Sequence, residues 1–332
     1  MTQTHRRSKV IDTLQQRHHF RARIRAIVRR FFADRNVVEV DTPALSEFAN
    51  PDPAIEPFLV QSAAKASPTL YLHSSPELAM KRLLCAGSGD IYQLCRVFRD
   101  AEIGRWHEPE FMMLEWYRLG FSADALMDEA ADLIGRCLAH NGKTLEVCKL
   151  SYREVFENYL SVDPLADPLA LRPALLAQFS TAGREIPHGM TSSALLDLAF
   201  ATLIAPVLPK GQLVFIYDYP AAQCSLARIR PTEPPVAARF EVFLNGIELG
   251  NGFEELTDAR EQRRRFEQER QDRLDLGLPA PPIDEPFLQA LDGGMPDCAG
   301  LAIGFDRLVA AAAGCERLAD AVDLPHSAAS GS

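Results

Sequence analysis

The clearest alternation of apolar and polar residues lies in the segment RFEVFLNGIELGN, residues 239–251. A period of two places successive side chains on opposite faces of a β-strand, and Asn245-Gly246 is a strong signal for a two-residue hairpin turn. The segment therefore predicts a hairpin in which Val242 lies opposite Leu249. One face of this hairpin is entirely apolar and consists of Phe240, Val242, Leu244, Ile247 and Leu249.

The opposite face of the predicted hairpin carries two carboxylates, Glu241 and Glu248. The turn makes them diagonal neighbours, which corresponds to Cβ atoms roughly 7–8 Å apart. Two carboxylates at that spacing can share a divalent cation, as Mg²⁺ sites do when they hold the phosphates of a nucleotide. An amphipathic hairpin with a solvated outer face is the alternative interpretation, and it needs no ligand.

The rest of the chain mixes helical and strand patterns. Apolar residues at helical spacing predict helices over residues 16–34, 76–86, 123–140, 192–205 and 257–274, and from 305 onward. Short apolar runs predict strands over residues 37–40, 91–99, 111–118, 213–217, 239–244 and 299–304. Helices inserted between antiparallel hairpins favour an α+β fold. We expect one domain over residues 1–326, with the Pro-rich stretches 231–235 and 279–286 as internal loops, and a disordered tail over residues 327–332.

The predicted strand over residues 111–118 also has two distinct faces, and the loop before it is rich in charge. Arginine is the usual planar partner of phosphate oxygens, so Arg99 in this region suits a phosphate group. An exposed aromatic residue such as Phe111 can stack on a base. The strand divides into a core face of Met112, Leu114 and Trp116 and a working face of Phe111, Glu115 and Tyr117.

A strand of unusually small residues, AGLAIG, covers residues 299–304. Gly300, Ala302 and Gly304 share one face, and a face of small residues lets a ligand approach the backbone closely. The strand leads into a helix whose N-terminus favours anions, with Arg307 beside it. Tight packing of a helix on a sheet is the simpler explanation of this pattern taken alone.

Composition narrows the class of protein. The 332 residues are 47% hydrophobic, with no apolar run of membrane-spanning length and no secretory signal, so we expect no membrane contact. The seven cysteines form no C-x-x-C pair, which favours reduced thiols and a cytoplasmic location. The net charge is −10, yet residues 1–36 hold ten Lys and Arg against two Asp. This basic N-terminal arm suggests an anionic contact, and a solvated helix face explains it equally well.

The chain has neither a P-loop nor a G-x-G-x-x-G loop, so a phosphate site here requires arginines and metal. Three segments resemble motifs 1, 2 and 3 of the class II aminoacyl-tRNA synthetases: the helix leading into residues 38–43, VFRDAEIGRWHEPEFMMLEWYR at 97–118, and GLAIGFDRL at 300–308. Together with SSPELAMKRLL at 74–84 and GNGFEELTDAREQRRRF at 250–266, they are similar to the lysine-specific branch over nearly the whole chain. The resemblance implies the class II catalytic fold, an antiparallel sheet flanked by helices.

Two departures from lysyl-tRNA synthetases point to one group of relatives. Those enzymes carry an OB-fold anticodon-binding domain before motif 1, whereas motif 1 begins here by about residue 20. They also have glycine where this chain has Ala302. In both respects the chain resembles the elongation factor P–(R)-β-lysine ligase family, which activates (R)-β-lysine as an adenylate and transfers it to a lysine of elongation factor P. The resemblance implies ATP and Mg²⁺ as cofactors, elongation factor P as partner, no tRNA, and a homodimer.

The resemblance also assigns roles to residues. Arg99 and Arg307 would be catalytic and hold the α- and γ-phosphates, and Glu241 and Glu248 would bind Mg²⁺. The residues that contact the amino acid would be Ser75, Pro76, Glu77, Tyr117, Asn251, Phe253, Glu255 and Ala302. The residues that bind ATP would be Arg99, Asp100, Ala101, Glu102, Glu108, Phe111, Glu248, Leu249, Gly304 and Arg307.

Two positions depart from the family pattern, and two other functions stay open. Motif 2 usually reads Arg-x-Glu, and that place holds Ala101 with Glu102 next to it, so either Glu102 or backbone groups recognise adenine. Glu108 replaces the asparagine that follows the motif 2 histidine in the ligases.

The other functions are a truncated lysyl-tRNA synthetase-like enzyme that activates α-lysine, and a non-catalytic nucleotide-binding paralogue. The extra methyl of Ala302, worth roughly 1–3 kcal/mol of steric discrimination, disfavours the first. The presence of every charged residue that adenylation needs disfavours the second.

Overall fold

The computed structural model describes residues 11–63, 68–139, 145–184, 186 and 189–326. Within these residues the large sheet consists of β1 (Val38–Glu39), β5 (Ile91–Phe98), β6 (Glu110–Leu119), β7 (Glu146–Ser151), β8 (Gln212–Pro220), β9 (Ile229–Arg230), β10 (Val236–Leu244), β11 (Ile247–Glu254) and β12 (Cys298–Gly304). A small sheet consists of β2 (Leu45–Ser46), β3 (Leu59–Val60) and β4 (Leu70–Leu72). The helices are α1 (Leu14–Ala33), α2 (Glu77–Cys85), α3 (Ala123–Leu138), α4 (Tyr152–Leu160), α5 (Pro168–Thr181), α6 (Ser192–Ala199), α7 (Ala259–Asp275), α8 (Glu285–Asp292) and α9 (Phe305–Ala313).

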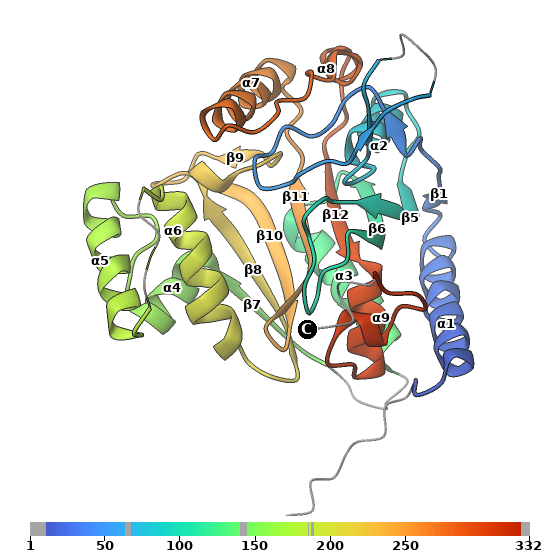
Figure 1. Ribbon diagram of the computed structural model, residues 1–332, viewed down its shortest axis with the longest axis horizontal. Coiled ribbons are helices and arrows are strands. Elements are labelled where there is room, and N and C mark those ends of the chain that lie inside the picture. The colour runs from blue at the N-terminus through green and yellow to red at the C-terminus, as the bar shows by residue number, and fades with distance from the viewer. Residues whose placement is uncertain (1–10, 64–67, 140–144, 185, 187–188, 327–332) are drawn as a thin grey trace, which may run out of the picture.

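The order of strands in the large sheet is β1-β5-β6-β12-β11-β10-β8-β7, and β9 pairs with β10 (Figure 1). The two outer pairs, β1–β5 and β7–β8, are parallel, and the inner pairs are antiparallel. Helices flank this sheet on both faces (Figure 1). This arrangement confirms the predicted α+β fold of the class II type.

Side chains that alternate along the central strands fill two separate cores, because successive residues of a strand point to opposite faces. Leu114, Trp116 and Leu301 belong to a core on the face that α1, α3 and α9 cover. Tyr117 and Phe253 belong to a second core, which receives residues of α4, α5 and α6 at one end and of α2 and α8 at the other. The second face is therefore covered at its two ends, and the cavities described below lie between them.

The β10–β11 hairpin confirms the predicted turn but corrects the predicted register. Asn245 and Gly246 have φ angles of +57° and +81°, as this type of turn requires. Beyond the turn a β-bulge shifts the pairing, so that Val242 lies opposite Gly250 and not opposite Leu249. The predicted register was wrong because nothing in the alternation of residues signals one extra residue in a strand.

Several other elements differ from the sequence predictions. The helix expected over residues 192–205 ends as an α-helix at Ala199 and continues as a π-helix over Phe200–Ile204. The loop expected over residues 279–286 ends early, because Asp284 caps α8 by accepting the N–H of Phe287 at 2.9 Å. Helices α4 and α5 and strand β7 were not predicted at all.

The described part of the basic N-terminal arm contains α1, and some of its arginines are paired with carboxylates. Arg21 is buried and forms a 2.6 Å ion pair with Asp306 at the start of α9. Arg29 forms a 2.9 Å ion pair with Glu39 of β1. An anionic partner of this arm, as the composition suggests, would therefore contact mainly the arginines other than Arg21 and Arg29.

Among the described residues, no helix combines the length and the apolar character that crossing a membrane requires. The single domain over residues 1–326 stays a prediction. The first ten residues of the arm and the tail expected over residues 327–332 lie outside the described residues.

Candidate active site

Strand pairing aligns the polar residues of the open face in rows that cross the sheet. One row, from β6 to β10, contains Glu115, Ala302, Asn251 and Glu241. Directly paired residues of neighbouring strands point to the same face, so these side chains converge although they are far apart in sequence. The adjacent row contains Tyr117, Gly300, Phe253 and Arg239.

A cavity of about 360 Å³, here called the main cavity, lies over these rows. Asp52 and Arg239 line it, and neither was singled out from the sequence. The predicted site residues that line it are Ser75, Glu77, Arg99, Glu102, Phe111, Glu241, Glu248, Leu249, Asn251, Phe253, Ala302, Gly304 and Arg307. The predicted site residues that do not line it are Pro76, Asp100, Ala101, Glu108, Tyr117 and Glu255.

The turn after β5 bears on the two alternatives for adenine recognition. Ala101 is exposed with a φ of +60°, and its N–H donates to Oδ1 of Asp100 at 2.8 Å. Glu102 instead faces the main cavity, 3.5 Å from Arg99. The left-handed residue turns the chain so that the second residue after Asp100 faces inward. This geometry favours Glu102 over backbone groups as the element that recognises adenine.

Glu108 has a different environment from the other predicted ATP-binding residues. It is 4% exposed, and its carboxylate accepts the backbone N–H of His326 at 2.9 Å. With Phe111 and Gly304 it lines a small cavity next to the main one. The Glu108 carboxylate therefore lies near the Phe111 ring, which is expected to stack on adenine. It also anchors the C-terminal segment through the backbone of His326.

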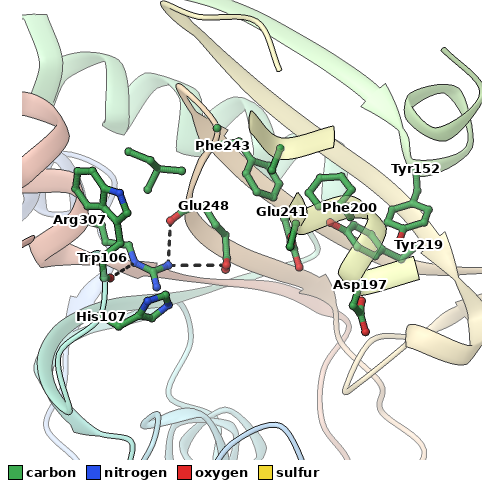
Figure 2. Close-up of a pocket in the computed structure, with 14 residues that line it drawn as sticks. Trp106, His107, Tyr152, Asp197, Phe200, Tyr219, Glu241, Phe243, Glu248 and Arg307 are labelled. Carbon is green, nitrogen blue, oxygen red and sulfur yellow. Dashed lines mark hydrogen bonds and ion pairs between the residues drawn. The ribbon is translucent and has the colours of Figure 1, made fainter. Parts of the chain in front are cut away.

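Both predicted catalytic arginines reach the main cavity. The Arg99 guanidinium lies 5.3 Å from the centre of the Phe111 ring. Arg307, in the first turn of α9, donates from Nε to the carbonyl oxygen of Trp106 at 3.1 Å and from Nη1 to that of Glu248 at 3.0 Å (Figure 2). A guanidinium has five N–H donors, so each arginine keeps donors for phosphate oxygens.

The two predicted metal ligands lie at the same end of the cavity. Burial raises the pKa of Glu241 to about 7, although its 2.6 Å ion pair with Arg239 opposes this shift and the charge of Glu248 adds to it. Within the part of the chain that the structure describes, these residues belong to no group of three or more side chains that could hold a metal by itself. Mg²⁺ commonly takes one or two carboxylates and completes its shell with phosphates and water, so the pair fits that ion.

Next to the cavity lies a buried ammonium group that was not predicted from the sequence. Lys81 on α2 forms ion pairs with Glu77 at 2.7 Å and with Glu255 at 2.6 Å, and its side chain is 1% exposed. These two carboxylates raise the pKa of Lys81 despite its burial. Glu77 and Glu255, expected as partners of the substrate, thus share an internal cation. The available signal was the helical spacing of four between Glu77 and Lys81.

Glu115, another residue that was not assigned to the site, has a buried carboxylate whose hydrogen-bond partners are neutral hydroxyl groups, so it is suited to receive a cation. It accepts the hydroxyl of Ser75 at 2.7 Å and that of Tyr117 at 2.6 Å. Burial, with the charge of Glu77 adding to it, raises the pKa of Glu115 to about 8. Its signal in the sequence was its place on the working face between Phe111 and Tyr117.

Gly300 fixes how closely these groups pack. A Cβ atom at this position would lie 2.5 Å from Oε1 of Glu255 and within the ring of Tyr117. Real contacts of a Cβ atom are essentially never that short, so this position of β12 accepts only glycine. Tyr117 and Glu255 consequently lie directly against β12, on the face of the sheet that carries the main cavity.

Comparison with known proteins agrees with this geometry. The family model described as tRNA synthetases class II (D, K and N) matches residues 2–328. A protein of Erwinia tasmaniensis named elongation factor P–(R)-β-lysine ligase is 47% identical over 306 residues, which are 91% of this chain and 92% of that protein. Proteins with the same name from Salmonella arizonae and Edwardsiella ictaluri are 47% identical over 308 and 309 residues, with the same coverage.

These matches span almost all of both chains, and the cavity contains the arginines and carboxylates on which the resemblance to class II motifs rested. The chain therefore belongs to the class II tRNA synthetase family and, within it, to the branch of the elongation factor P–(R)-β-lysine ligases.

Proposed function

We propose that the protein activates (R)-β-lysine with ATP and transfers the β-lysyl group to a lysine ε-amino group of elongation factor P. The observation that carries the proposal is the main cavity, which Arg99, Arg307, Glu241 and Glu248 line together with Glu77. The buried carboxylates of Glu115 and Glu255 are neighbours of Glu77. The first set suits ATP, and the second suits an amino acid with two ammonium groups. The names of the relatives support the same substrates.

At the ATP end, the carboxylate of the amino acid attacks the α-phosphorus and pyrophosphate leaves. Arg99 neutralises charge that develops on the α-phosphate, and Arg307 holds the γ-phosphate. Fixed donors of this kind act mainly by electrostatic stabilisation of the transition state. Glu241 and Glu248 would hold Mg²⁺, which would supply positive charge that stabilises the leaving pyrophosphate.

At the amino-acid end, buried carboxylates receive the ammonium groups. Glu115 has two hydroxyl partners, Ser75 and Tyr117, so a substrate cation can supply the positive charge that its carboxylate lacks. Ala302 lies between Glu115 and Asn251 in the same row. Its methyl group therefore stands where the backbone of the amino acid must fit, and we assign to it the discrimination between β-lysine and α-lysine.

The remaining parts of the proposal concern context. We propose that the enzyme acts without tRNA, as a homodimer built on the motif 1 region, and in the cytoplasm. The seven free cysteines support a reducing compartment. The chain has widely spread thiols that burial keeps protonated, as the raised pKa of Cys137 to about 12 illustrates.

The proposal is tested by ATP–pyrophosphate exchange with (R)-β-lysine and with α-lysine, in the absence of tRNA. We expect strong exchange with β-lysine, weak exchange with α-lysine, and formation of a β-lysyl amide when elongation factor P is added. A preference for α-lysine would favour the lysyl-tRNA synthetase-like function. Absence of exchange with either amino acid would favour the nucleotide-binding paralogue.

A further inference from the structure

A second cavity, of about 400 Å³, adjoins the main one (Figure 2). The two share Glu241, Glu248 and Arg307, the residues at the phosphate end. Its other walls come from the loop between β5 and β6, from α4, α6 and the π-helix, and from strand β8 and the hairpin. The second cavity thus meets the main cavity at its phosphate end.

Aromatic rings form one wall of the second cavity. Phe243, Phe200 and Tyr152 follow one another with ring centres 5.2 and 5.9 Å apart, and Tyr219 lies 4.5 Å from Tyr152 (Figure 2). Beside this wall is the carboxylate of Asp197, which accepts a hydrogen bond from Gln223 at 2.7 Å. An apolar wall that ends in a carboxylate matches a side chain with a hydrocarbon stem and a cationic tip.

The lining of the second cavity carries more negative than positive side chains, which favours a cationic occupant. Three carboxylates line it, those of Asp197, Glu241 and Glu248, against the single guanidinium of Arg307 among the arginines and lysines in its lining. Its backbone is also specialised, because Phe200 and Ala201 of the π-helix face it. A π-helix is rare and is frequently found at functional sites.

We propose that the second cavity is the channel through which the lysine side chain of the acceptor protein reaches the aminoacyl adenylate. This inference rests on the proposed function and names the route of its second substrate. The stem of the acceptor lysine lies along the aromatic wall, and Asp197 attracts its ammonium group. Once pyrophosphate has left, the space beside Glu241, Glu248 and Arg307 connects the channel with the acyl group.

During transfer the acceptor ammonium group loses two protons and gains one bond to carbon. The ammonium group loses one proton to water at the mouth of the channel, where Asp197 is exposed. The free lone pair of the nitrogen attacks the acyl carbon, so that a C–N bond forms and the C–O bond to phosphate breaks, with its electron pair leaving on AMP. The second proton passes from the nitrogen to the phosphate of AMP and then to water.

The decisive test fills the channel without touching the adenylation site. Ala201 is exposed on the cavity wall, so Ala201→Trp adds bulk where the lysine stem would lie. Ala177→Trp, at an exposed position of α5 that does not line the cavity, is the matched control. For Ala201→Trp we expect exchange with ATP and (R)-β-lysine to stay within about twofold, and transfer to elongation factor P to fall by roughly tenfold or more, because the amine loses its attack position. The control should leave both rates unchanged.

A second variant guards against a folding defect. Asp197→Asn keeps an oxygen for the hydrogen bond with Gln223 and removes the charge. It should raise the KM for the acceptor protein and leave the KM for (R)-β-lysine unchanged. Hydroxylamine, a small nucleophile that needs no channel, should trap the β-lysyl group at equal rates in both variants and in the unmodified protein.

Three outcomes would overturn the channel. They are undiminished transfer by Ala201→Trp, loss of exchange and transfer together in a folded Ala201→Trp, and an unchanged KM for the acceptor in Asp197→Asn. Failure of the unmodified protein to modify elongation factor P would instead refute the proposed function. The same variants assayed with Nα-acetyl-lysine amide as acceptor would then still test the channel.

Discussion

The two ends of the main cavity balance their charges in different ways. At the amino-acid end, Lys81 and Glu255 are both 1% exposed and are paired with each other. At the phosphate end, Arg307 and Glu248 are 19% and 44% exposed, and their ion pair is a loose 3.8 Å. Buried pairs are fixed before any ligand arrives, whereas exposed pairs exchange partners at little cost. The structure thus combines a rigid receptor for the amino acid with an adaptable receptor for ATP.

The largest expected effect concerns the rigid end. Lys81→Met should lower the free energy of unfolding by roughly 3–5 kcal/mol, because it leaves two carboxylates buried without their cation. Lys149→Met is the matched control, since Lys149 also lies between two carboxylates, those of Asp124 and Asp128, but both are largely exposed. Its loss should cost about 0–1 kcal/mol. Chemical denaturation measures both values, and equal losses would show that the end at Lys81 is no more rigid than the surface.

The next effect concerns the adaptable end. Arg307→Ala should reduce ATP–pyrophosphate exchange by roughly 10²–10³-fold, the range seen when one fixed donor to a transition state is removed. The free energy of unfolding should change little, because the ion pair of Arg307 with Glu248 is loose and Glu248 is 44% exposed. Arg264→Ala, an exposed arginine of α7 paired with Glu261, is a control for the loss of a surface cation. Unchanged exchange in Arg307→Ala would remove this residue from the mechanism.

A substitution at Ala302 tests how strongly the amino-acid end of the cavity discriminates between β-lysine and α-lysine. Ala302→Gly removes the methyl group between Glu115 and Asn251, and we expect the ratio of kcat/KM for β-lysine to that for α-lysine to fall by roughly 10-fold or more, consistent with about 1–3 kcal/mol for one methyl group. The measurement is exchange with each amino acid in turn. An unaltered ratio would place the discrimination elsewhere in the pocket.

Sequence patterns predicted the faces of this site better than its contacts. The working faces of β6 and β12 followed from alternation, since period two in a strand is a local property of the chain. The bulge that places Val242 opposite Gly250 did not, because one extra residue leaves the alternation on each side intact. The ion pair of Lys81 with Glu255 joins α2 to the end of β11, and no local pattern announces a contact between such distant segments.

The π-helix at Phe200 shows the same limit within a single element. The apolar spacing over residues 192–205 correctly indicates a helix, but it cannot distinguish an α-turn from the wider π-turn that follows Ala199. That difference of one residue per turn decides which side chains face the second cavity. Site features that depend on long-range ion pairs, on a β-bulge or on a π-helix could therefore be identified only from the structure.

A pH dependence should also separate the two ends. Glu115 must be ionised to receive an ammonium group, and burial raises its pKa to about 8, so below that pH most of the ligand-free protein carries it protonated. The ionised fraction rises about tenfold per pH unit well below the pKa and by about fivefold over the last unit. At saturating ATP and Mg²⁺, the KM for (R)-β-lysine should therefore fall by about tenfold from pH 6 to pH 7, by about fivefold from pH 7 to pH 8, and level off above that. Glu115→Gln should weaken binding and abolish this slope. A slope that persists in Glu115→Gln would assign the titration to the phosphate end, where Glu241 also has a raised pKa.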